Sequence, residues 1–178
     1  EAVVDYNGSG LSVIEMSHRS APIVEIMEEA RSLVKEVLNV PDGYQVLYLQ
    51  GGASTGFLTT VYNMMKEGGS ACYVDTGAWS NKALKEAKKF GSVEVVASSE
   101  DKNYNYVPKN YPIKRDANYL HLTSNNTIFG TQMKQFPVST IPMVCDMSSD
   151  IFSRAVNVAD FDMIYAGAQK NLGPAGTT

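Results

Sequence analysis

One lysine of this 178-residue chain lies in a setting that suits covalent chemistry. Lys170 follows the apolar and small residues of 163–169 and precedes Asn171-Leu172-Gly173-Pro174. A lysine in a small-residue turn after a buried strand is poorly placed to be an ordinary surface charge. Partial burial would lower the pKa of its amine and favour the neutral form that Schiff-base chemistry needs. The sequence therefore indicates Lys170 as a nucleophile.

A carboxylate with several potential roles ends another apolar run. Asp146 follows residues 141–145, so we expect it at the tip of a strand. There it can cap a helix, bind a metal or pair with a protonated ring nitrogen. The absence of a neighbouring His or acid cluster in the sequence argues against a metal. Capping and nitrogen pairing both stay open.

A glycine turn, Gly51-Gly52-Ala53-Ser54-Thr55, lies between a predicted strand and a predicted helix. Its backbone N–H groups can face an anion at the helix N-terminus, and its hydroxyls can add a hydrogen bond. The stretch matches neither a Walker A loop nor a dinucleotide fingerprint, so a purely structural turn is the alternative.

Three further side chains are candidates by type and position. Trp79, the single tryptophan, follows Gly77 on a polar loop, which favours stacking on a ligand over filling the core. His18 and Arg19 precede the first predicted helix and can bind a carboxylate or phosphate, or form a surface pair. His121 alternates with apolar neighbours, and we interpret it as a satisfied core histidine.

The elements that must position these residues alternate between β-rich runs and amphipathic stretches, which predicts an α/β domain with a largely parallel sheet. We predict helices over residues 20–38, with Ser20 as the cap, and over 55–66 and 80–90. The predicted strands cover residues 44–50, 70–75, 93–97, 119–123, 143–146 and 163–166. Ligands bind at the carboxyl ends of such strands, where the glycine turn, Trp79, Thr127, Asp146, Ser148 and the Gln169-Lys170 pair all fall.

Composition narrows the class of protein. Apolar residues make up 44% of the chain, charged residues 19%, and the formal net charge is -4. These values exclude a disordered tail and a basic nucleic-acid-binding face. Cys72 and Cys145 lie in apolar runs, so we expect buried, reduced thiols. With no apolar stretch near the roughly 20 residues of a membrane span and no visible cleavable signal, we expect a cytoplasmic location.

Six segments together make the chain resemble the phosphoserine aminotransferases, which are class-V, fold-type I enzymes dependent on pyridoxal 5'-phosphate. The segments are Ser17-His18-Arg19, Gly51-Gly52, residues 75–79, residues 124–128, residues 146–149 and the lysine run 165–175. The resemblance covers essentially the whole chain, and its lysine run is the most specific segment. It implies a three-layer α/β/α domain with a mainly parallel sheet.

The resemblance also implies a role for each candidate. Lys170 would form the Schiff base with pyridoxal phosphate, Asp146 would pair with the ring nitrogen, and Trp79 would stack on the ring. Thr127 would bond the phenolic oxygen. Ala53 and Ser54 would donate backbone N–H groups to the cofactor phosphate, with Ser148 and Gln169 nearby. His18 and Arg19 would bind the acidic tail of the substrate.

The reaction so implied transfers an amino group between glutamate and 3-phosphohydroxypyruvate, giving phosphoserine and 2-oxoglutarate in serine biosynthesis. The family is about twice as long as this chain, and the chain opens on Glu1 without Met. We therefore expect residues 1–178 to be the cofactor-binding large domain, without the small C-terminal domain and the extreme N-terminus. The complete, active site would belong to a homodimer of the longer parent, and this fragment alone need not be active.

One departure from the family pattern and two other readings keep alternatives open. Some relatives carry arginine in the glycine turn, where this chain has Ser54, so phosphate binding there would rely on other groups. Another fold-type I enzyme, such as a cysteine desulfurase or an alanine–glyoxylate-type aminotransferase, is the second reading, although desulfurases usually stack a histidine where Trp79 falls. The third is a non-catalytic α/β ligand-binding domain, which predicts no lysine that borohydride can trap.

Overall fold

The computed structural model describes residues 3–178, which divide into two compact units, one ending at Leu47 and the other spanning Tyr48–Thr178. The first unit contains helix α1 (Ala21–Val37), as its apolar spacing predicts. Ser20 occupies the N-cap position with an extended backbone. Ser20 is thus the N-cap residue, as predicted, but its hydroxyl accepts no hydrogen bond from the first N–H groups of the helix and donates instead to the Ser17 carbonyl oxygen (2.7 Å).

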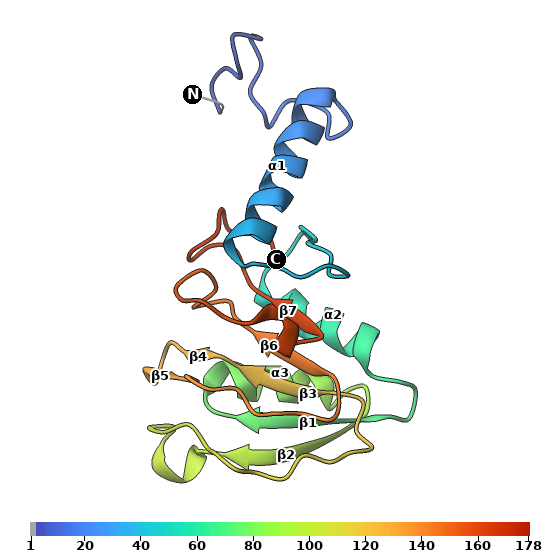
Figure 1. Cartoon of the computed structure of the whole chain (residues 1–178), viewed down its shortest axis with the longest axis vertical. Coiled ribbons are helices and arrows are strands. Elements are labelled where there is room, and N and C mark those ends of the chain that lie inside the picture. The colour runs from blue at the N-terminus through green and yellow to red at the C-terminus, as the bar shows by residue number, and fades with distance from the viewer. Residues whose placement is uncertain (1–2) are drawn as a thin grey trace. The chain divides into compact units, whose positions relative to one another are not determined.

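The second unit is built on a five-stranded sheet whose strands are all parallel (Figure 1). Its strand order is β2-β1-β3-β6-β7. The strands are β1 (Ser70–Asp75), β2 (Ser92–Ser98), β3 (Leu120–Thr123), β6 (Met143–Asp146) and β7 (Met163–Tyr165). The mainly parallel sheet with flanking helices confirms the predicted fold class.

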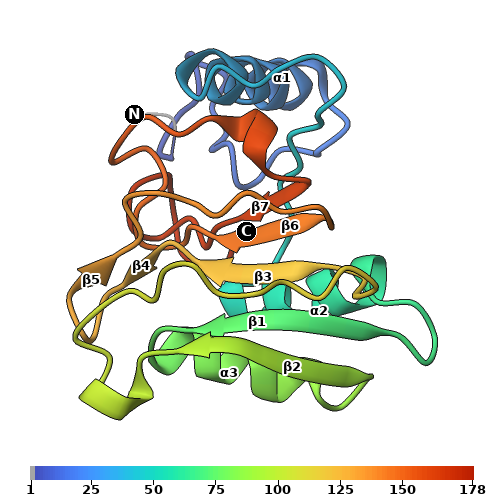
Figure 2. The same ribbon diagram turned by 60° about the horizontal axis from the view of Figure 1, so that its bottom comes forward.

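Helices α2 (Ala53–Met64) and α3 (Ala78–Ala87) cover one face of this sheet, on its far side in Figure 2. Phe57 of α2 and Leu84 of α3 pack there against Tyr73 and Val144 of the strands. The other face is covered by long connections that include residues 107–113 and 151–161, with the 3-10 helix η2 (Val158–Asp160). A second 3-10 turn, η1 (Glu100–Lys102), follows β2. Both faces of the central strands β1, β3 and β6 are thus buried, as is typical of a parallel sheet, whereas the edge strand β2 is partly exposed.

One predicted strand is wrong. Residues 44–50 form no strand in the described chain, and Gln50 alone makes an isolated β-bridge. A strand needs a neighbour that supplies its ladder of hydrogen bonds. Here only the last residues lie alongside: Leu49 exchanges two backbone hydrogen bonds with Thr178 (2.8 and 2.9 Å), and Gln50 bridges Thr177.

The structure also contains a small hairpin that the sequence did not predict. Strands β4 (Asn125–Asn126) and β5 (Thr131–Gln132) pair antiparallel immediately after β3. Two residues per strand are too few to show the period-2 alternation by which strands are predicted. The turn between these strands carries Thr127.

Buried positions agree with most sequence predictions. Cys72 and Cys145 are buried free thiols, as expected, and burial raises the pKa of both. His121 is fully buried, with Nε2 2.8 Å from the Tyr165 hydroxyl, whereas its Nδ1 has no partner among the described residues. The predicted core histidine is thus confirmed, but it is satisfied at only one nitrogen. No helix of the described chain is long and apolar enough to cross a membrane.

Candidate functional site

The carboxyl edge of the sheet brings together residues that are far apart in sequence. The turn after β7 carries Lys170, whose Nζ lies 3.0 Å from the Thr127 Oγ1 of the β4–β5 turn. These two predicted site residues therefore meet. Lys170 is exposed, so the burial expected from its apolar surroundings is wrong. The reason is that residues 166–168, which follow β7, are still buried, and the chain then turns out of the core before it reaches Lys170.

Asp146 is only 4% exposed at the end of β6. Its Oδ1 accepts hydrogen bonds from the Ser148 N–H (2.9 Å) and hydroxyl (2.5 Å). Burial raises the pKa of the Asp146 carboxyl, while the Ser148 hydrogen bonds and the positive charge of Lys170 act in the opposite direction. Neither hydrogen bond uses Oδ2, so one oxygen of a buried carboxylate is left for another donor. Within residues 3–178, no group of three His, Cys, Asp or Glu side chains is arranged to hold a metal.

Ser148 connects Asp146 to the lysine turn. Its hydroxyl donates to Asp146 and accepts a hydrogen bond from the Gly167 N–H (3.0 Å). A Cβ at Gly167 would lie 3.0 Å from the Gln169 Oε1 and 3.3 Å from the Ala53 nitrogen. Glycine therefore allows the end of β7 to approach the first residue of α2. Ala53, Ser148 and Gln169, all predicted site residues, meet around this point.

The glycine turn leads into α2 as predicted. Gly51 has a φ of 112°, in the region that favours glycine, and a Cβ there would lie 2.5 Å from the Thr55 Oγ1. Gly52 is the N-cap, and it provides no side-chain hydrogen bond to the first turn of α2. The first turn also contains no acidic residue. The N–H groups of Ala53 and Ser54 and the positive end of the helix dipole are thus available to an anion, whereas the Thr55 N–H donates to the Gly52 carbonyl oxygen (2.8 Å).

Trp79 lies at the start of α3 with 40% of its surface exposed, which excludes the core-filling alternative. The turn before it is fixed by Ser80, whose Oγ accepts hydrogen bonds from the N–H groups of Thr76 (2.8 Å) and Gly77 (2.9 Å). The same hydroxyl lies 2.9 Å from the buried Asp75 carboxylate. These contacts fix the turn before α3 and therefore the position of the Trp79 backbone.

Lys82 is a site residue that the sequence analysis missed. Its Nζ lies 3.2 Å from the Ser54 Oγ and 5.6 Å from the centre of the Trp79 ring. It therefore adds a positive charge beside the start of α2. The sequence analysis missed it because the predicted helix began at residue 80 and left Trp79 on a loop. In the structure both residues lie on α3, three positions apart, and such pairs share a face.

The remaining two predicted residues are placed in the other unit. His18 and Arg19 are exposed in the turn before α1. All the contacts described above are made between residues of Tyr48–Thr178, and neither His18 nor Arg19 takes part in them. Their role in binding a substrate stays a prediction.

Comparison with known proteins agrees with this arrangement. The family model for class-V aminotransferases matches residues 1–178. The phosphoserine aminotransferase of Flavobacterium psychrophilum is 63% identical over the whole chain, which covers 50% of that protein. The solved structure of the phosphoserine aminotransferase from Bacillus circulans subsp. alkalophilus superposes with a TM-score of 0.92 at 49% identity, over 98% of this chain and 49% of that one.

A pyridoxal-phosphate-bound phosphoserine aminotransferase from Trichomonas vaginalis is similar as well, with a TM-score of 0.90, 34% identity, and coverage of 98% of this chain and 50% of that one. The chain thus spans about half the length of the relatives that it matches. The match of the family model to all 178 residues, together with these identities, shows that the chain belongs to the class-V aminotransferase family.

Proposed function

We propose that the full polypeptide carrying this sequence uses pyridoxal phosphate to transfer an amino group between glutamate and 3-phosphohydroxypyruvate, giving phosphoserine and 2-oxoglutarate. The observation that carries this proposal is the position of Lys170. Its amine lies 3.0 Å from Thr127 and close enough to Asp146 for its charge to affect that carboxyl's pKa. The relatives named phosphoserine aminotransferase supply the substrate pair.

The residues present fit the cofactor. The amine of Lys170 is exposed and can hold an aldehyde carbon covalently. Asp146 offers Oδ2 to a protonated ring nitrogen, and Trp79 offers an exposed ring for stacking. The N–H groups at the start of α2, with the Ser54 hydroxyl and the Lys82 ammonium, offer hydrogen bonds and positive charge to a phosphate.

These residues divide the work of the reaction. When bound, pyridoxal phosphate supplies an electron sink for the charge that develops on the substrate's α-carbon. Asp146, as a carboxylate, stabilises the proton on the ring nitrogen. Thr127 holds the lysine turn by its contact with Nζ. With its amine free, Lys170 Nζ would accept the proton from the substrate's α-carbon as general base and would then deliver it, as general acid, to the former aldehyde carbon of the cofactor, C4′.

The first test is covalent labelling. The protein is mixed with pyridoxal phosphate, reduced with borohydride and mapped by peptide mass spectrometry. We expect a visible absorption band and a label on Lys170, both absent from Lys170→Ala and retained by Lys109→Ala, which changes an exposed lysine outside the site. A label spread over surface lysines, or one that Lys170→Ala retains, would contradict the proposal. The full polypeptide is then assayed for phosphoserine formation from glutamate and 3-phosphohydroxypyruvate.

We further propose that the full polypeptide is a homodimer located in the cytoplasm. Ile128, beside Thr127, is 64% exposed, and Leu172, beside the lysine turn, is also exposed, as is Trp79. Large apolar side chains at the rim of a ligand site favour a covering by further protein. The two buried free thiols fit a reducing compartment. Sedimentation equilibrium should give twice the polypeptide mass, and a monomer at concentrations that support activity would rule out the dimer.

A further inference from the structure

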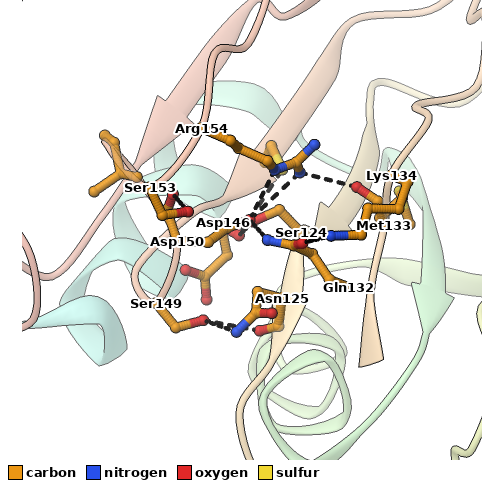
Figure 3. A network of polar contacts seen from close by, with 12 residues as sticks. Ser124, Asn125, Gln132, Met133, Lys134, Asp146, Ser149, Asp150, Ser153 and Arg154 are labelled. Atoms are coloured by element: carbon orange, nitrogen blue, oxygen red, sulfur yellow. Dashed lines mark hydrogen bonds and ion pairs between the residues drawn. The ribbon is translucent and has the colours of Figure 1, made fainter. Parts of the chain in front are cut away.

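Figure 3 shows a network of polar contacts around Asp150, next to Asp146, and none of the roles assigned above uses the Asp150 carboxylate. At its centre is Asp150, four residues after Asp146 and only 5% exposed. Its Oδ2 accepts hydrogen bonds from the Gln132 Nε2 (3.0 Å) and from the Arg154 Nε and Nη2 (3.4 and 3.3 Å). Its Oδ1 makes a short contact with the Ser124 hydroxyl. One carboxylate thus joins three segments of chain.

Two of these segments carry predicted cofactor-binding residues. Ser124 connects β3 to the β4–β5 hairpin, and its N–H donates to the Asp146 carbonyl oxygen (3.0 Å). Gln132 lies on the second strand of that hairpin. Asp150 itself lies in the turn that follows β6, whose last residue is Asp146. The carboxylate therefore couples the segment that presents Thr127 to the segment that presents Asp146.

The hairpin needs such contacts because it is too short to be stable alone. Each strand has two residues, and a two-stranded hairpin is marginal in water even when longer. Its first strand is also held to the same turn, since Asn125 Nδ2 donates to the Ser149 Oγ (2.9 Å) and Ser149 donates to the Asn125 carbonyl oxygen (3.0 Å). Side chains of the turn after β6 therefore hold both strands.

Arg154 forms an ion pair with the buried Asp150 carboxylate (Nη2 to Oδ2, 3.3 Å). Arg154 lies four residues further on and lies over the Phe136 ring at 5.3 Å from its centre, while its Nη2 also donates to the Met133 carbonyl oxygen (2.9 Å). A buried carboxylate without such a partner would be strongly destabilised. With it, Asp150 is a fixed acceptor at the base of the hairpin.

We propose that Asp150 is a positioning residue whose buried carboxylate fixes the β4–β5 hairpin, and thereby Thr127, relative to Lys170 and Asp146. This inference rests on the proposed function for the meaning of Thr127. The placement of the hairpin itself does not depend on it, and the two can be tested separately.

The first measurement is amide hydrogen exchange of the protein without added cofactor. Gln132→Ala removes the hairpin's contact with Asp150 and leaves the ion pair with Arg154 in place. We expect the N–H groups of Gly130 and Met133, which close the hairpin through Asn126 and Ser124, to exchange about tenfold faster or more. Exchange in β1 should not change. Unchanged protection of the hairpin would overturn the inference whether or not the protein binds pyridoxal phosphate.

The second measurement is a double-mutant cycle on the affinity for pyridoxal phosphate, in the full polypeptide. We expect Asp150→Asn to weaken binding about tenfold, which corresponds to about 1.4 kcal/mol, and Thr127→Ala to weaken it as well. If Asp150 acts through Thr127, Asp150→Asn should have little further effect in the Thr127→Ala background. Losses that simply multiply would mean that Asp150 serves only general stability, which contradicts the inference.

The control variant is Ser153→Ala. The Ser153 hydroxyl donates only to the main-chain oxygen of Asp150 (2.7 Å), so its removal perturbs the same turn without touching the carboxylate. Its affinity should stay within about twofold of the unmutated protein. If Asp150→Asn fails to fold, Gln132→Ala takes its place in the cycle. Failure of the unmutated protein to be labelled at Lys170 would count against the proposed function, and the exchange result would still decide the role of Asp150.

Discussion

At the scale of single residues, a charged Asp146 lowers the stability of the free protein, because it is buried, and is expected to strengthen the binding of a cationic ring nitrogen. Burial raises its pKa, so the folded chain holds this proton more tightly than the unfolded chain does. The unfolded state then binds fewer protons, and stability falls as pH rises from the unfolded pKa through the folded one. A cationic partner for Oδ2 would offset this cost.

Replacing Asp146 by Asn should separate these two effects. Without cofactor, Asp146→Asn should be more stable than the unmutated chain at pH 7, and the gain should vanish in acid, where both forms are neutral. Its affinity for pyridoxal phosphate should fall about tenfold or more, because a charge-assisted hydrogen bond is lost. Urea unfolding at several pH values and a cofactor titration measure both. Glu67→Gln, at an exposed position, should change neither, and a destabilised Asp146→Asn at pH 7 would contradict this account.

His121 should make the fold sensitive to acid. Burial lowers its pKa to about 3, from 6.5 for an ordinary histidine. The unfolded chain therefore binds more protons between these values, and stability is lost as pH falls through this range. At pH 5 the loss from this residue should be about 2 kcal/mol relative to neutral pH.

His121→Phe should flatten that part of the pH dependence, while costing some stability at neutral pH through the lost contact with Tyr165. Urea unfolding from pH 7.5 down to pH 5 is the measurement. His18→Gln, at an exposed histidine, is the matched control and should keep the acid slope of the unmutated chain. An equally steep slope in His121→Phe would show that another group causes it.

At the scale of elements, the turn into α2 tests the backbone geometry that leaves its N-terminus open. Gly51→Ala should destabilise the protein by about 2 kcal/mol and weaken cofactor binding, because φ is 112° and the added Cβ would meet Thr55. Gly52→Ala has an extended backbone and open space around the Cβ, so it should cost less than about 1 kcal/mol. Chemical denaturation of the two variants compares them. Equal costs would mean that the turn is not constrained at Gly51.

At the scale of the whole molecule, ligand binding should stabilise the folded chain by mass action. Pyridoxal phosphate at 100 times its Kd should add about 2.7 kcal/mol to the free energy of unfolding. The increase in Tm should be smaller for Lys170→Ala at the same concentration, and smaller for pyridoxal, which has no phosphate for α2 and Lys82. Differential scanning calorimetry measures these shifts. Equal shifts for Lys170→Ala and the unmutated chain would contradict a lysine-held cofactor.

Much of the architecture was predictable from local pattern. The amphipathic spacing of α1, the apolar runs of β1 and β6 and the small-residue turn before Lys170 each identify an element or a candidate from neighbouring residues alone. The predicted strand at 44–50 failed because strand formation depends on a pairing partner elsewhere in the chain. The β4–β5 hairpin was missed because its two-residue strands show no pattern of their own. Its residues instead make contacts with Ser149 and Asp150, which a local pattern does not reveal.

The sequence by itself determined the types of the reactive groups and their order along the chain, because residue chemistry and strand periodicity are local properties. It also determined that Lys170, Asp146 and Thr127 would fall at one edge of the sheet, because parallel strands end together. Only the tertiary structure decided that Lys170 is exposed and hydrogen-bonded to Thr127, and that the Lys82 amine forms a hydrogen bond with Ser54. It alone shows the contacts of Asp150 with Ser124 and Gln132, because such contacts depend on how distant segments pack.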